Sequence, residues 1–257
     1  MASQFSITNT GTFDVLAGSN ISGKPFFASP IPLGIVTSNL VLHLDAGNTS
    51  SYPGSGTTWS DLSGNNTNGT LRNSPTFNSD GGGNIVFNGT NHYVETFSSL
   101  VDVTTNWTVN VWYKTTGSSG IGSLLVRGNF DETYQWRCEL DASTGKVRFA
   151  MRNLAFPSDQ SVLGTTSTNN TGWHMATYTN NSNLVTVYLD AVSENSATIT
   201  NLTNSNIGSN AVIGRLGDSV GPYYFNGNVA IVQVYNRALS LSEIQQNFAA
   251  RKSRYGL

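Results

Sequence analysis

Short segments in which apolar and polar residues alternate recur along the chain from residue 39, with Gly, Asn, Ser and Thr between them. A period of two is typical of β-strands that turn one face to a core and the other away from it. In 107–113, for example, we expect Val109 and Val111 on one face and Trp112 on the opposite face. No helical pattern separates the segments, so the sequence predicts an all-β fold of two antiparallel sheets, a sandwich or jelly roll. The predicted strands are 40–44, 84–87, 92–95, 107–113, 123–126, 134–140, 146–151, 173–178, 184–189, 211–214 and 229–235.

Local signals predict one hairpin and one helix. Asn88 and Gly89 lie between 84–87 and 92–95, and Asn-Gly is a strong signal for a β-hairpin turn. Ser240 is placed to cap a short C-terminal helix, with Glu243 at the capping-box position. The apolar stripe of this helix consists of Leu241, Ile244 and Phe248. The cations expected to complement its dipole are Arg251, Lys252 and Arg254.

Composition excludes several classes of function. Only 11% of the 257 residues are charged, against ~25% in an ordinary soluble domain, and the net charge is −2. A chain without a basic excess is a poor nucleic-acid binder, and no apolar run is long enough for a membrane span. With 12 Phe, 10 Tyr and 5 Trp, the chain has enough large apolar side chains for a core. We therefore expect no nucleic-acid partner and no membrane insertion.

The N-terminal residues 1–38 differ from the rest of the chain. They have neither the basic nor the apolar region of a secretory signal, so no signal peptide is expected. Three prolines between 25 and 32 exclude a helix or a central strand there. Either this segment is a loop packed on the domain, or it is an extended arm that docks on a partner. The docking residues of such an arm would be Phe26, Phe27, Ile31 and Leu33.

A series of motifs resembles the laminin-G-like, concanavalin A-like lectin/glucanase family from Val41 to the C-terminus. The motifs are 44–48, 58–65, 87–89 with 93–95, 107–112, 172–174, 187–190, 213–215, 225–229 and 234–240. The first and last of them resemble domains of tailed-phage virion proteins, especially those of marine and cyanobacterial phages. The resemblance implies an antiparallel two-sheet jelly roll over 39–257 that binds glycans or protein partners.

Some members of this family hold calcium, which prefers carboxylate oxygens. Here Asn88 and the pair Ala230–Ile231 stand where relatives often carry acids. Asp45, Asp61 and Asp218 remain as candidate ligands, and we expect no required cofactor.

Catalytic relatives hydrolyse β-glucans with several acids on one face of a strand. Glu139-Leu140-Asp141 begins like that motif, but 142–145 lack the third acid and are typical of a hairpin turn. Retaining hydrolysis needs two carboxyl groups about 5 Å apart, and the sequence offers no convincing second one. We therefore expect no enzymatic activity. Cys138 lies in a predicted strand without an activating context, which favours a buried structural thiol. The histidines His43, His92 and His174 show no zinc spacing, and His174 is expected to be structural.

Glycan binding needs aromatic faces for sugar C–H surfaces and polar groups for hydroxyls. The candidate ligand-binding residues are Tyr52, Asp61, Asn65, Asn129, Asp131, Asp218 and Tyr223. The alternative for each of them is a role in the core or in a turn, which we also consider for Trp59 and Tyr224.

Two hypotheses about function follow. The first is a non-catalytic virion surface protein, made in the host cytoplasm: a head decoration, fibre or tail component. Residues 1–38 would attach this homo-oligomeric protein to other virion proteins and display the jelly roll, which would also contact host-cell glycans. The second is a glycan-binding module of a bacterial surface or secreted protein.

Overall fold

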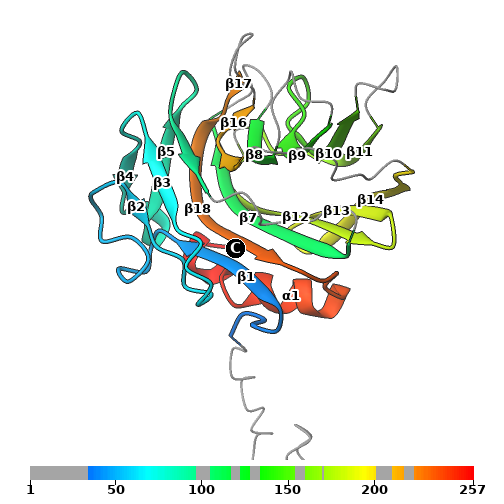
Figure 1. Ribbon diagram of the computed structural model, residues 1–257, viewed down its shortest axis with the longest axis horizontal. Coiled ribbons are helices and arrows are strands. Elements are labelled where there is room, and N and C mark those ends of the chain that lie inside the picture. The colour runs from blue at the N-terminus through cyan, green and yellow to red at the C-terminus, as the bar shows by residue number, and fades with distance from the viewer. Residues whose placement is uncertain are drawn as a thin grey trace, which may run out of the picture. The chain divides into compact units, whose positions relative to one another are not determined.

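The computed structural model describes residues 34–96, 105–116, 122–127, 134–153, 160–169, 171–200, 210–216 and 223–257. Nearly all the regular structure consists of antiparallel β-strands in two large sheets (Figure 1). This architecture is the two-sheet jelly-roll sandwich predicted from the alternating segments.

Sheet A has eight strands built around β18. This strand pairs with β7 along one edge, and along the other edge it pairs first with β5 and then with β1. The remaining strands extend the sheet in the order β14-β13-β12-β7-β18-β5-β4. The strands of sheet A are β1 (Leu40–Asp45), β4 (Thr76–Asn78), β5 (Asn84–Asn88), β7 (Trp107–Thr115), β12 (Trp173–Asn181), β13 (Leu184–Leu189), β14 (Val192–Thr198) and β18 (Asn226–Tyr235).

Sheet B also has eight strands, in the order β11-β10-β9-β8-β15-β6-β3-β2. They are β2 (Thr58–Trp59), β3 (Gly69–Arg72), β6 (Tyr93–Glu95), β8 (Gly122–Arg127), β9 (Tyr134–Leu140), β10 (Lys146–Asn153), β11 (Gln160–Ser167) and β15 (Ala211–Ile213). A two-stranded ribbon, β16 (Arg215–Leu216) with β17 (Tyr223–Tyr224), follows β15. The helical elements are η1 (Asp80–Gly82), α1 (Leu241–Ala249) and η2 (Lys252–Tyr255).

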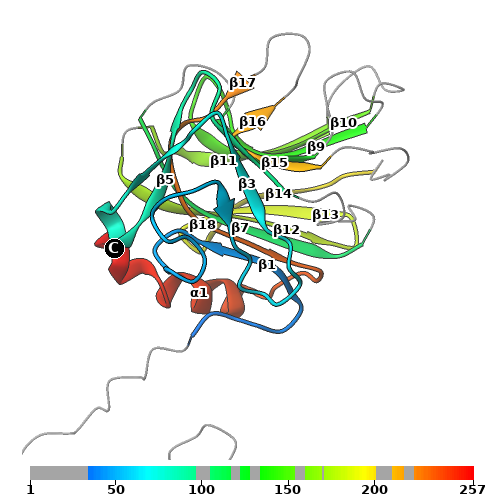
Figure 2. The same ribbon diagram turned by 60° about the vertical axis from the view of Figure 1, so that its left-hand side comes forward.

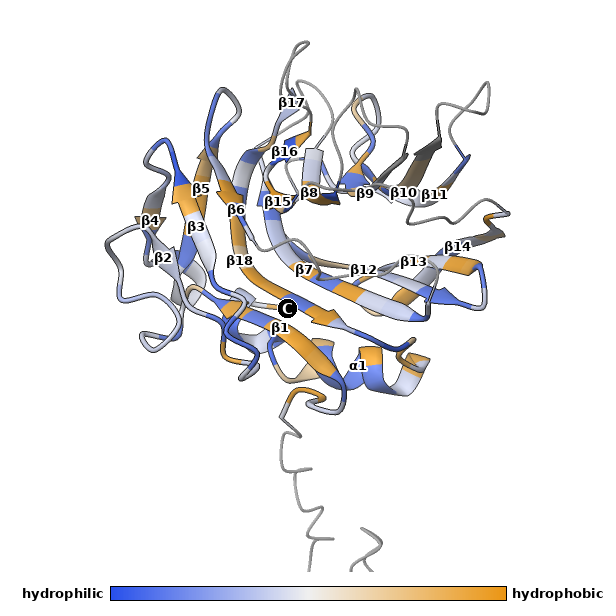
Figure 3. Cartoon of the chain, viewed as in Figure 1, coloured by the Kyte–Doolittle hydropathy of each residue, from blue (hydrophilic) through white to orange (hydrophobic). Residues whose placement is uncertain are grey.

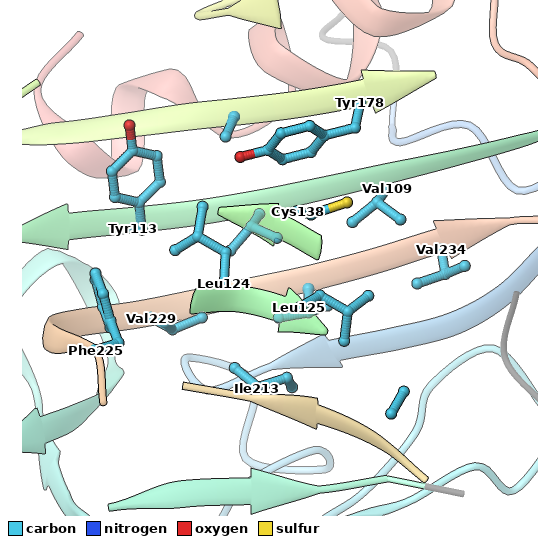
Figure 4. Close-up of a cluster of buried hydrophobic side chains, with 14 of the residues drawn as sticks. Val109, Tyr113, Leu124, Leu125, Cys138, Tyr178, Ile213, Phe225, Val229 and Val234 are labelled. Atoms are coloured by element: carbon cyan, nitrogen blue, oxygen red, sulfur yellow. The ribbon is translucent and has the colours of Figure 1, made fainter. Parts of the chain in front are cut away.

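The main core lies between the two sheets (Figure 4). Trp107 of sheet A stacks on Trp136 of sheet B, with ring centroids 6.5 Å apart. Across the same interface the Tyr178 hydroxyl donates a hydrogen bond to the Glu139 carbonyl oxygen at 2.9 Å. Val109 belongs to this core and Trp112 lies on the opposite face of β7, as predicted. Cys138 is also buried here, which confirms the prediction of a structural position for this thiol.

A second apolar layer covers the face of sheet A that points away from sheet B. Helix α1 and η2 lie against this face (Figure 2), and strands β1 and β18 beside them are rich in apolar residues (Figure 3). Trp112 stacks with Phe248 at 5.5 Å and with Tyr255 at 4.4 Å between ring centroids. The C-terminal segment therefore protects a sheet face that would otherwise expose a tryptophan.

Helix α1 begins as predicted, since Ser240 and Glu243 form a capping box. Its predicted apolar stripe is wrong at Leu241, which is 48% exposed, while Ile244 is buried. The three cations directly follow the helix, since α1 ends at Ala249 and its last turn contains none of them. Arg254 forms an ion pair of 2.6 Å with Asp45 at the end of β1.

The predicted hairpin around Gly89 is not formed. Strand β5 pairs with β4 and β18 in sheet A, whereas β6 pairs with β3 and β15 in sheet B. The turn therefore carries the chain from one sheet to the other. Gly89 has φ +69°, and the Asn88 side-chain oxygen accepts backbone hydrogen bonds from Thr90 and Asn91. The Asn-Gly pair marks the turn, but β5 and β6 pair with other strands and not with each other.

Residues 34–38, which the sequence places in the arm, pack on the C-terminal region. Asn247 accepts a hydrogen bond from the Val36 backbone N–H at 2.8 Å, and the Tyr235 hydroxyl donates one to the Val36 carbonyl oxygen at 3.0 Å. The sequence boundary at residue 38 thus falls inside a packed segment. Among the residues described, no helix has the length and apolarity that a bilayer crossing requires.

Candidate binding surface

The predicted ligand-binding residue Tyr52 lies in the core. Its side chain is 3% exposed, its ring lies 5.7 Å from that of Phe77, and its hydroxyl donates to the Gly56 carbonyl oxygen at 2.9 Å. This position leaves no ring face open to a sugar. Trp59 is likewise fully buried, as the alternative interpretation of this residue expected.

The structure brings Asp61 and Asn65 together in one loop. The Asp61 carboxylate accepts hydrogen bonds from the backbone N–H groups of His43, at 2.8 Å, and Thr67, at 3.1 Å. Ser63 joins the two predicted residues, because its hydroxyl donates to Asp61 and accepts from the Asn65 amide. Asn65 also donates to carbonyl oxygens of β1. These polar groups therefore organise the loop and fasten it to β1.

Tyr223 is 41% exposed on β17. β17 belongs to the two-stranded ribbon, whereas the Asp61 loop is fastened to β1 of sheet A, so the structure does not bring Tyr223 and Asp61 into one group. The remaining predicted residues lie outside the described part of the chain. They are the ligand-binding candidates Asn129, Asp131 and Asp218 and the docking candidates Phe26, Phe27, Ile31 and Leu33.

The outer face of sheet B, defined here as the face that points away from the core, carries paired charges. On β9, Trp136, Cys138 and Leu140 point into the core, so Arg137 and Glu139 between them point outward. Glu139 is nevertheless fully buried, and it forms ion pairs with Arg137 at 3.2 Å and with Arg148 at 2.8 Å. In the stretch 139–141, which resembles the start of a catalytic motif, the Glu139 carboxylate is thus held between two guanidinium groups. Asp141 caps the β9–β10 turn by accepting hydrogen bonds from Ser143 and Thr144.

A second group of side chains lies farther along the outer face of sheet B, and we call it the Tyr93–Arg215 cluster. Its members are Arg72 of β3, Tyr93 and Glu95 of β6, Asn210 before β15, and Arg215 of β16. Arg72 donates two hydrogen bonds to one oxygen of Glu95, at 2.7 and 3.0 Å, and Asn210 donates to the other oxygen at 3.3 Å. The Arg215 guanidinium carbon lies 4.2 Å from the centre of the Tyr93 ring. Aromatic, cationic, anionic and amide groups therefore meet on one surface.

The electrostatics of this cluster follow from its contacts. The hydrogen bond from Arg72 lowers the pKa of Glu95, burial opposes that effect, and Asn210 and Arg215 lower it further. The Glu95 carboxylate therefore stays ionised at a lower pH than an ordinary glutamate does. The sequence alone did not point to this cluster, although Tyr93 and Glu95 alternate in a predicted strand and so share a face.

A local backbone feature positions Arg215. Gly214, between β15 and β16, has φ +85°, and a Cβ built on it would lie 2.5 Å from the Phe87 ring. Glycine is therefore needed where the chain leaves sheet B and brings Arg215 over Tyr93. Arg215 pairs in register with Tyr224, so the half-buried Tyr224 shares its face of the ribbon, while Tyr223 lies on the opposite face.

Several other acidic and histidine side chains have internal partners. His174 lies 2.7 Å from Asp190 and 2.7 Å from the Thr171 hydroxyl, which supports its predicted structural role. Asp45 and Arg254 line a pocket of about 430 Å³ beside the C-terminal segment, where their ion pair already forms. Within the described ranges, no group of three or more His, Cys, Asp or Glu side chains is placed to hold a metal ion.

A family model described as the concanavalin A-like lectin/glucanases superfamily matches residues 88–245. Comparison with curated proteins finds no matching sequence.

Several solved structures have a similar fold. Domain 4 of AbnA, a GH43 extracellular arabinanase from Geobacillus stearothermophilus solved with arabinotriose, has a TM-score of 0.66 at 17% identity over 82% of this chain and 98% of that one. The binding domain of Paraclostridial Mosquitocidal Protein 1 has a TM-score of 0.62 at 17% identity over 82% of this chain and 52% of that one. Trypanosoma rangeli sialidase in complex with sialic acid has a TM-score of 0.63 at 18% identity over 86% of this chain and 34% of that one. The chain thus spans about half of the toxin domain and a third of the sialidase, and the likeness is one of fold.

Proposed function

Because the chain belongs to the concanavalin A-like lectin/glucanases superfamily, we propose that it is a non-catalytic binding module whose glycan surface is the outer face of sheet B. The Tyr93–Arg215 cluster is the observation that carries this proposal. It combines the half-buried Tyr93 ring with planar hydrogen-bonding groups, and the half-buried Tyr224 lies beside Arg215. Such groups match the apolar faces and hydroxyls of a sugar.

The environment of Glu139 supports a non-catalytic module. A glycosidase acid must carry a proton and reach the substrate oxygen. Glu139 has no exposed surface, and two arginines stabilise its charged form. Its contacts suit a structural ion-pair cluster better than an acid catalyst.

A glycan array with matched variants tests the binding surface. Tyr224→Ala removes a half-buried ring beside Arg215, and we expect it to weaken binding of the best glycan by about tenfold or more, equivalent to about 1.4 kcal/mol. Leu184→Ala is the control, because Leu184 is 45% exposed on β13 in the other sheet. Binding that is insensitive to Tyr224→Ala, or absent for every glycan, would overturn the proposal.

We also propose that the module works on a virion surface, as one of several copies attached through its N-terminal arm. The motifs 44–48 and 234–240, with their resemblance to phage virion domains, and the apolar residues of 25–33 support this location. Deleting residues 2–33 keeps the contacts of Val36 with Asn247 and Tyr235. We expect the shortened protein to remain folded but to stop co-sedimenting with particles. Unchanged attachment would argue against this location and would favour a module of a bacterial surface or secreted protein.

A further inference from the structure

Arg215 has an unusual set of contacts for a half-buried arginine. One face of its guanidinium lies on the Tyr93 ring. Among the described residues, no carboxylate or carbonyl oxygen accepts a hydrogen bond from it. A stacked ring occupies the face of a guanidinium, whereas its five N–H donors point outward in the plane. Among the residues that the structure describes, these oriented donors therefore have no acceptor.

The nearest carboxylate in the cluster is already engaged. Both oxygens of Glu95 accept hydrogen bonds, one from Arg72 and the other from Asn210. The cluster thus holds two guanidinium groups and one carboxylate, which leaves one positive charge in a chain whose net charge is −2. Glu95 takes its hydrogen bonds from Arg72 and Asn210, so within this cluster the excess positive charge lies on Arg215.

A planar guanidinium with free in-plane donors matches a carboxylate, which it binds through two parallel hydrogen bonds. We propose that the outer face of sheet B recognises an acidic sugar, such as a uronic or sialic acid, through a paired contact between its carboxylate and Arg215. The sugar ring would lie against Tyr224, which shares that face of the ribbon. This inference rests on the proposed glycan-binding function and names the class of glycan.

The test compares acidic sugars with their neutral forms on the full-length chain. Oligogalacturonate, oligomannuronate and sialyllactose are each titrated beside their methyl esters, which keep the sugar and remove the charge. We expect at least one acid to bind about tenfold or more tightly than its ester, and the preference to weaken as salt rises.

Variants assign the preference to one side chain. Arg215→Gln should abolish the difference between acid and ester, and Arg215→Lys, which keeps the charge but not the planar fork, should restore it only in part. Lys252→Gln is the control, because it makes the same change of charge at an exposed position on η2. Thermal melts confirm that the variants are folded.

Two results would overturn the inference while leaving the proposed function intact. One is equal binding of acids and esters by a protein that binds neutral glycans. The other is an acid preference that survives Arg215→Gln. If neither the acids nor a neutral panel binds, both the inference and the proposed function fail.

Discussion

Glu139 is the residue on which the question of catalysis depends. Replacing it with Gln would leave Arg137 and Arg148 without their shared counter-charge in a buried place. We predict that Glu139→Gln lowers the free energy of unfolding by about 3 kcal/mol, measured in urea, because breaking a buried ion pair leaves uncompensated charge. Neither protein should release sugar from laminarin. The opposite result would be that the wild type hydrolyses laminarin and that Glu139→Gln abolishes this activity without loss of stability. That result would show that Glu139 is a catalytic carboxylate.

Cys138 allows a test of how tightly the core is packed around a single side chain. Its thiol is fully buried, and burial together with the nearby Glu139 charge raises its pKa well above the usual value. Because the thiolate is the reactive form, we predict no reaction with a thiol reagent at pH 8 in the folded protein and one equivalent after denaturation. Rapid labelling of the native protein would contradict the burial.

Single polar residues were the hardest to interpret from the sequence. Asp, Asn and Tyr in loops have the same appearance whether they bind a ligand or hold a turn. Asp61 bonds to the backbone of His43, and Arg254 pairs with Asp45 more than two hundred residues away. Such partners are set by the tertiary fold, so no local pattern identifies them.

Among the elements, the edge strands β11 and β14 are joined by one carboxylate. Glu194 of β14 accepts hydrogen bonds from the backbone N–H and hydroxyl groups of Thr165 and Thr166 on β11. This contact covers edge N–H groups that would otherwise be open to another strand. Burial alone would raise the pKa of Glu194, but the four hydrogen bonds outweigh it and hold the pKa below its usual value.

The sign of the pH dependence follows from that shift. A carboxylate with a lowered pKa in the folded state adds stability above its unfolded pKa, about 4.3, and loses it as the pH falls through the folded value. We predict that Glu194→Gln lowers the free energy of unfolding at pH 7. At an acidic pH below the folded pKa of Glu194, the difference in stability from the wild type should shrink. Urea unfolding at pH 7 and at that acidic pH measures this difference. A difference that is independent of pH would show that the carboxylate charge is not what matters.

The strands that the sequence predicted are those with an apolar face, such as 134–140 and 184–189. β11 and β14 were missed because they are polar edge strands, and β14 has the sequence VSENSAT with mostly exposed residues. In β14 no face is buried, and in β11 only Val162 and Gly164 are buried, so the apolar alternation that identifies a strand is missing. The Asn88 turn was placed correctly, but its role in crossing between sheets depends on long-range pairing.

In the whole molecule, Arg254 connects the C-terminal segment to two other regions. Its guanidinium pairs with Asp45 and donates to the carbonyl oxygens of Gly81 and Gly83. We predict that Arg254→Gln lowers the free energy of unfolding by about 2 kcal/mol, since charged hydrogen bonds in a partly buried place are lost. Hydrogen exchange over 250–257 should also accelerate.

Lys252→Gln is the matched control for Arg254→Gln, because Lys252 lies two residues away and is exposed. A surface substitution of this kind should change stability by less than about 0.5 kcal/mol. Equal effects of the two variants would mean that the net charge of the segment, and not the Arg254 contacts, stabilises the C-terminus.

The sandwich offers two large outer faces, and they differ in a way that bears on function. The outer face of sheet A is covered by α1 and η2, whereas that of sheet B carries the Tyr93–Arg215 cluster, in which Tyr93 and Arg215 are half-buried. We therefore expect the glycan to bind on the outer face of sheet B and not on that of sheet A.

Hydrogen–deuterium exchange with and without a bound glycan locates the binding surface. We predict slower exchange in 69–72, 93–95 and 210–216 on glycan binding, with exchange in 241–255 unchanged. Protection confined to 241–255 or to the strands of sheet A would contradict it.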